Sequence, residues 1–123
     1  MSRLNVANYR HPDASSDSFN LNSDASFTLS GGVSSTERTI TTGSWNLATG
    51  NFWTCGAITI PSPTNAVAGT GGLIRVTAAP TFPTECKFPG GTYTAPTAFP
   101  AIIPFYVQNS TTLLMGNWTE GIA

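Results

Sequence analysis

The stretch Ile103-Pro104-Phe105-Tyr106-Val107-Gln108-Asn109-Ser110-Thr111-Thr112-Leu113-Leu114-Met115 decides the fold. Apolar side chains at positions 103, 105 and 107 alternate with other residues, which is the period of a strand with one face on a core. The turn-forming residues of 108–110 then reverse the chain into a second apolar run from 112 to 118. The sequence therefore predicts a closing antiparallel hairpin.

Similar runs occur about every ten residues along the rest of the chain. They are residues 26–30, 37–42, 44–49, 52–60 and 73–77. Turn signals separate them at 31–32, 50–51, 61–65, 69–72 and 89–91, where glycine permits positive φ and proline fixes extended backbone. Six residues are predicted to set these turns: Pro63, Asn65, Gly69, Pro89, Gly90 and Gly91.

The composition agrees with short strands. Only 9% of the 123 residues are charged and 40% are hydrophobic, with Ser, Thr, Gly, Asn and Pro filling the remainder. These residues disfavour helices and suit strands joined by turns. We predict an all-β fold, an antiparallel β-sandwich or small barrel of jelly-roll or immunoglobulin-like type. Its body spans residues 26–123.

Residues 1–25 differ from this body because their apolar residues are sparse and widely spaced. Such a segment is too polar to form a core alone. We predict an extended N-terminal arm that contacts a partner through Leu4, Val6, Tyr9 and Arg10. A loosely docked terminus is the alternative interpretation.

The sequence contains few residues that could form a catalytic, metal or cofactor site. His11 is the single histidine and lies in the polar arm, so we expect no catalytic residue. Cys55 and Cys86 lack the spacing of a metal site, and we expect no metal and no cofactor. A chain made in a reducing compartment more often carries two buried thiols than a disulfide, although the sequence leaves both possible.

The charge pattern limits the partners. The formal net charge is −1, and the five basic residues are scattered, which argues against a nucleic-acid partner. Weak charge favours association into an assembly. Residues 1–5 contain no apolar run and no stretch reaches the length of a membrane span, so we expect neither a signal peptide nor a membrane partner.

The large aromatic residues have two possible roles. Flat rings could stack on sugars, or they could fill the core or a subunit interface, and we favour core or interface. These residues are Trp45, Trp53, Tyr93, Phe99, Tyr106 and Trp118.

Two segments resemble a known family. Residues 63–76 read PTNAVAGTGGLIRV and residues 87–92 read KFPGGT, with Pro96-Thr97 just beyond. Together they resemble a small β-rich domain of virion structural proteins from tailed phages, notably phages of cyanobacteria and marine bacteria. The resemblance covers about residues 43–123. Relatives often carry tryptophans just before the second segment, where this chain has Thr84-Glu85-Cys86.

The resemblance implies a non-enzymatic virion protein made in the host cytoplasm. We predict a capsid decoration, or cement, protein on the outer capsid surface. It would bind the major capsid protein and form a homotrimer. The alternative is a tail fibre, spike or baseplate module that binds a host surface glycan.

Overall fold

The computed structural model describes residues 8–9, 19–21, 27–29 and 35–122. It divides the chain into two compact units, Met1–Ser34 and Ser35–Ala123.

The first unit contains a three-stranded antiparallel sheet in the order β1-β2-β3. The strands are β1 (Asn8–Tyr9), β2 (Phe19–Leu21) and β3 (Phe27–Leu29). β3 pairs with β2, and the division between the two compact units falls after Ser34.

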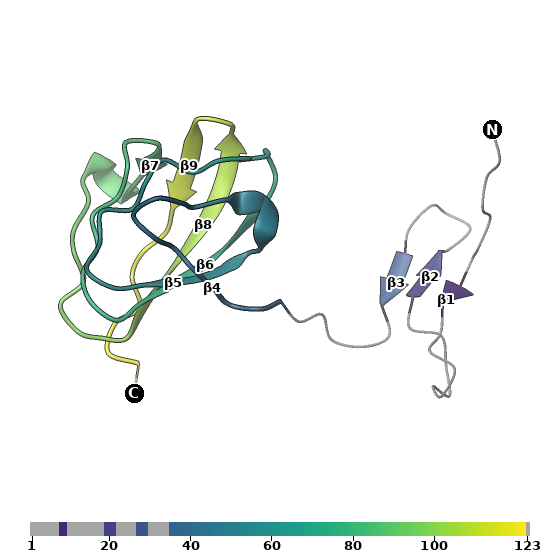
Figure 1. Ribbon diagram of the computed structural model, residues 1–123, viewed down its shortest axis with the longest axis horizontal. Helices are drawn as coiled ribbons and strands as arrows, with labels where there is room; N and C mark the ends of the chain where they lie inside the picture. The colour runs from purple at the N-terminus through teal and green to yellow at the C-terminus, as the bar shows by residue number, and fades with distance from the viewer. Residues whose placement is uncertain (1–7, 10–18, 22–26, 30–34, 123) are drawn as a thin grey trace. The chain divides into compact units, whose positions relative to one another are not determined.

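The second unit is a six-stranded mixed sheet in the order β4-β5-β6-β8-β9-β7 (Figure 1). Its strands are β4 (Arg38–Thr39), β5 (Phe52–Cys55), β6 (Gly71–Val76), β7 (Cys86–Lys87), β8 (Ala101–Asn109) and β9 (Thr112–Met115). The pairs β4–β5, β5–β6 and β7–β9 are parallel, whereas β6–β8 and β8–β9 are antiparallel.

The β class is confirmed, but the predicted antiparallel sandwich or barrel is wrong in its arrangement. The described residues of the second unit form one open sheet with short strands at both ends. Long connections such as 56–70 return the chain to the end from which it started, which is what a parallel pair requires. Where a sandwich would have its second sheet, this chain has proline-rich loops. Proline has no N–H group to donate to the hydrogen bonds between strands.

One face of this sheet, the inner face, carries the core. Its rows follow the strand register, for example Trp53 beside Ile74 beside Ile103. Loop residues pack over these rows, among them the fully buried Trp45, Ile60 and Pro80. The inner face comprises Trp53, Cys55, Ile74, Val76, Cys86, Ala101, Ile103, Phe105, Val107, Leu113 and Met115, all buried.

The predicted closing hairpin is confirmed by β8 and β9, the two yellow-green strands in Figure 1. Pro104 lies within β8 although proline has no N–H for the ladder. Its carbonyl oxygen still accepts a hydrogen bond from the Gly116 nitrogen at 2.8 Å, just beyond the end of β9. The N–H group that Pro104 lacks would therefore lie opposite Gly116, where the pairing of β8 with β9 ends.

Two local predictions are wrong. Residues 44–49 were expected to form a strand, but Leu47–Thr49 is a 3₁₀ turn, because the Asn46 side chain accepts from the Ala48 nitrogen at 3.0 Å. The glycine cluster 69–72 was expected to be a turn throughout, but Gly71 and Gly72 begin β6. The two regular turns, Leu47–Thr49 (η1) and Pro89–Gly91 (η2), are both of the 3₁₀ type. Among the described residues, no helix is long and apolar enough to cross a membrane.

Candidate functional site

The opposite face of the second unit's sheet is apolar and open. We call it the outer face, and its exposed apolar residues are Phe52, Leu73, Pro104, Tyr106 and Leu114. The strand register aligns Phe52, Leu73 and Pro104 in one row across β5, β6 and β8. It also aligns Tyr106 with Leu114 across β8 and β9. Tyr106 is 50% exposed and Leu114 is 42% exposed. Large apolar side chains in adjoining rows are the typical signature of a contact surface.

The centre of the outer face is shallow. A hollow of about 290 Å³ lies between Pro104, Tyr106, Leu114 and Gly116. A Cβ atom at Gly116 would lie 2.6 Å from the Pro104 Cγ, so glycine lets the proline ring lie against the neighbouring strand. The face is thus suited to a broad partner surface more than to a small enclosed ligand.

Two charged residues of the outer face, Arg75 and Glu37, are paired with each other. Arg75 lies in a row with Thr54 and Ile102, and its guanidinium binds the Glu37 carboxylate through two nitrogens at 2.6 and 2.9 Å. The hydrogen bond from Arg75 lowers the pKa of Glu37, and the same bond raises the pKa of Arg75. Both groups are therefore charged at neutral pH, and the pair adds no net charge to the face.

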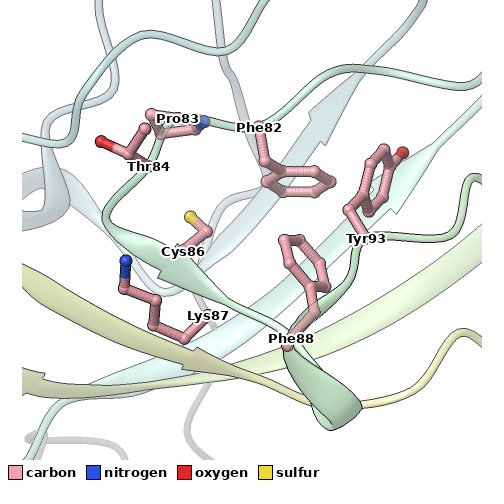
Figure 2. Close-up of a pocket in the computed structure, with 8 residues that line it drawn as sticks. Phe82, Pro83, Thr84, Cys86, Lys87, Phe88 and Tyr93 are labelled. Carbon is pink, nitrogen blue, oxygen red and sulfur yellow. The ribbon is translucent and has the colours of Figure 1, made fainter.

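A second candidate site is an aromatic pocket of about 270 Å³ (Figure 2). Phe82, Phe88 and Tyr93 face one another there, with ring centroids 4.9 to 5.3 Å apart. Lys87 and Thr84 supply polar groups at its margin. An aromatic wall beside an ammonium and a hydroxyl is a reasonable frame for a polar ring such as a sugar.

Side chains that line this pocket already pack on, or hydrogen-bond to, other parts of the protein. The Tyr93 hydroxyl donates to the Pro80 carbonyl oxygen at 2.6 Å, and Phe82 also packs on Trp118 with centroids 6.2 Å apart. Burial raises the pKa of Tyr93, so its hydroxyl remains a neutral donor. The rings meet edge to face or tilted, which leaves few open ring faces for a ligand.

The first family-like segment fastens a loop to the sheet. Asn65 has φ +56° and its amide donates to the Asn46 Oδ1 at 2.8 Å. Thr64 exchanges backbone hydrogen bonds with Trp45 and Leu47 at 2.9 and 3.0 Å, which holds the buried indole of Trp45 over the core. Gly69, with φ +90°, donates to the Val107 carbonyl oxygen at 2.9 Å. These contacts assign Asn65 and Gly69 to turn geometry, and Pro63 lies in the same loop.

The second family-like segment makes a tight turn after β7. Pro89 begins η2, and Gly90 and Gly91 have φ values of +73° and +79°. The Gly91 nitrogen donates to the Phe88 carbonyl oxygen at 2.9 Å and closes this turn. The Phe88 ring packs against Phe82 and Tyr93 (Figure 2). Left-handed backbone at two successive residues explains the glycine pair.

The cysteines lie on the inner face. Both are buried and unpaired, in line with the two-thiol interpretation. Burial raises the pKa of Cys55 to about 11, and burial together with the Glu85 carboxylate raises the pKa of Cys86 to about 12. Neutral thiols are poor nucleophiles and poor metal ligands, so these residues serve as packing groups.

The residues of the predicted arm contact lie mostly outside the described part of the chain. Tyr9 lies in β1, whereas Leu4, Val6, Arg10 and His11 lie outside the described residues. Their contact role stays a prediction. Within the described part of the chain, no cluster of three or more His, Cys, Asp or Glu residues could hold a metal ion.

The aromatic residues divide between core and surface. Trp45 and Trp53 are buried, as favoured from the sequence, and Tyr93 and Trp118 are half-buried. Phe99 and Tyr106 are exposed. The sequence reasoning overlooked the outer-face role of Phe52, Leu73 and Leu114. The signal was present, because β5, β6 and β9 place apolar residues next to one another where a one-sided sheet would alternate.

Comparisons with protein-family models, with curated proteins and with solved structures find no match for this chain.

Proposed function

We propose that this chain is a non-enzymatic structural protein of a tailed-phage virion, acting as a decoration or cement protein on the outer capsid surface. Two lines support the proposal. The segments 63–76 and 87–92 resemble those of phage virion proteins, and their residues set loop geometry instead of forming a reaction centre. The outer face offers an apolar contact surface on a small β body.

The main support for this proposal is that large apolar residues are exposed on the outer face. A decoration protein performs no reaction and works by making many repeated contacts. An apolar surface on which Arg75 and Glu37 neutralise each other suits that task because its contacts need no ligand and vary little with salt. The predicted partners, the major capsid protein and two further copies in a homotrimer, belong to the same proposal.

The copy number in the virion tests this assignment. Quantitative mass spectrometry of purified virions should give a ratio to the major capsid protein near one, or a simple fraction set by capsomer symmetry. A few copies per hundred capsid subunits would contradict a decoration role and place the chain in the tail.

The N-terminal unit can be tested separately. A chain starting at Ser35, the first residue of the second unit, retains the whole described core. We expect it to stay folded by circular dichroism and to lose binding to undecorated shells, because the predicted contacts Leu4, Val6, Tyr9 and Arg10 are removed. Retained binding would show that the second unit alone holds the shell.

The aromatic pocket favours one alternative, a tail module that binds a host glycan. A glycan array with the purified chain tests it, with Lys87→Ala as the variant expected to lose binding and Arg38→Ala, outside the pocket, as its matched control. A specific glycan signal that Lys87→Ala removes would favour the tail assignment over the decoration role.

A further inference from the structure

The strands of the second unit carry apolar residues on both faces. Leu113, Leu114 and Met115 follow one another in β9, and Pro104, Phe105 and Tyr106 do so in β8. A sheet with one face in water alternates apolar and polar residues, whereas strands covered on both sides read as continuous apolar runs. The sequence of β8 and β9 is therefore that of a sheet whose outer face is also covered.

The charges on the outer face allow the same face of a second copy to pack against it. The ionic groups of the face are Arg75 and Glu37, which neutralise each other at 2.6 Å, and Lys87 lies in the row of Leu114 toward the β7 edge. The whole chain carries a formal charge of only −1. Two copies can approach face to face with little like-charge repulsion, which a strongly charged surface would prevent.

The size of the face indicates the strength of the contact. Five strand spacings of about 4.8 Å and four residues of about 3.3 Å give a footprint on the order of 300 Å². Stable protein pairs bury about 800 Å² per partner, so the outer face alone supports a weak contact. Weak contacts of this kind suffice where an assembly repeats them or holds the copies at high local concentration.

We propose that the outer face is a self-association surface, on which another copy of this chain packs with its own outer face. Phe52, Leu73, Pro104, Tyr106 and Leu114 form the contact, in the way that two sheets pack about 10 Å apart. The inference deepens the proposed function and rests on it only for its biological setting, because it names the occupant of this surface.

Sedimentation of the full-length chain tests this inference. Between about 10 μM and 1 mM, the weight-average mass should rise from one copy toward two, because a contact between identical faces closes as a pair and the interface is weak. Leu114→Glu places a carboxylate in the middle of the contact and should weaken association at least tenfold. Val67→Glu is the matched control because Val67 is 62% exposed in the loop between β5 and β6 and is not one of the five contact residues, and it should associate like the unchanged chain.

The outcomes separate clearly. A particle of two copies that Leu114→Glu dissociates and Val67→Glu leaves intact supports the proposal. A chain that stays monomeric up to 1 mM overturns it, as does an oligomer that Leu114→Glu leaves intact. Circular dichroism of Leu114→Glu checks folding, and Tyr106→Asp, at a position 50% exposed, provides a second variant if the first is misfolded.

This test is independent of the virion assignment. A monomeric chain that is abundant in capsids would overturn the self-association surface and leave the decoration role standing. A chain that self-associates but is present at only a few copies per virion would support the self-association surface and contradict the decoration role.

Discussion

Both faces of the six-stranded sheet carry large apolar residues, and the two faces differ in what covers these residues. On the inner face, Ile74 and Leu113 are fully buried beneath loops. On the outer face, their chain neighbours Leu73 and Leu114 are about 40% exposed, at 37% and 42%. Hydrophobicity alone therefore does not tell which side of this sheet forms the core.

The loops make the difference. Segments rich in proline and threonine cross the inner face and are fastened by backbone hydrogen bonds, such as Ile60 to Thr81 at 2.9 Å. No described segment of the second unit buries the outer apolar residues in the same way. The second unit therefore encloses one face of its sheet beneath its own loops and leaves large apolar residues of the other face exposed.

The sharpest test of this comparison uses two adjacent leucines. Leu113→Ala should lower the free energy of unfolding by about 2 to 5 kcal/mol, because it removes buried methyl groups and leaves a cavity. Leu114→Ala should lower it by less than about 1 kcal/mol, because its side chain is 42% exposed. Urea unfolding of dilute, monomeric protein measures both, and equal losses would contradict the assignment of the two faces.

A glycine on the inner side gives the next largest effect. A Cβ atom at Gly72 would lie 1.7 Å from the Asn51 carbonyl oxygen, and that oxygen accepts from the Leu73 nitrogen at 3.0 Å. Gly72→Ala should therefore destabilise the fold by about 1 to 3 kcal/mol. Gly43, with nothing within 4 Å of an added Cβ, is the control, and Gly43→Ala should leave the melting temperature equal or slightly higher.

The buried thiols predict how stability depends on pH. A thiol in the unfolded chain ionises near pH 9, whereas burial raises the pKa of Cys55 to about 11 and that of Cys86 to about 12. Above pH 9 the unfolded chain loses these protons first. The contribution to stability is thus complete below pH 9 and falls as pH rises toward 12.

Urea unfolding between pH 8 and pH 11 with a reductant, at about half-unit steps, measures this fall. The double variant Cys55→Ala/Cys86→Ala should show a shallower decline over the same range. Identical slopes for the two proteins would show that the thiols are accessible to water, against their place on the inner face.

The smallest effect is expected on the outer face. Glu37→Gln breaks the ion pair with Arg75, yet both side chains are about 40% exposed, at 40% and 42%. We expect a change in unfolding free energy of at most about 1 kcal/mol, and less in high salt. A larger loss in thermal or urea unfolding would mean that the pair is shielded from water in the isolated chain.

The sequence predicted the parts of the fold that depend on neighbouring residues. The alternation in 103–107 and the turn signal at 108–110 were sufficient for the β8–β9 hairpin, and the glycines at 69, 90 and 91 for positive φ. Strand order could not be predicted in this way, because parallel pairing of β5 with β6 depends on where a long loop returns.

The candidate site was harder to predict for the same reason. Phe52, Leu73 and Pro104 are far apart in the sequence and form one row only through the register of β5, β6 and β8. The alternation rule also misled at 44–49, because the Asn46 side chain competes for a backbone donor and starts a 3₁₀ turn.

Hydroxyl-radical footprinting of the full-length chain at low and high protein concentration tests the central claim most directly. Oxidation of Tyr106, Phe52 and Leu114 should fall several-fold as the protein concentration rises, whereas oxidation of the exposed loop residue Val67 should stay constant. Unchanged oxidation of the three outer-face residues would contradict the claim that further copies of the chain cover this face.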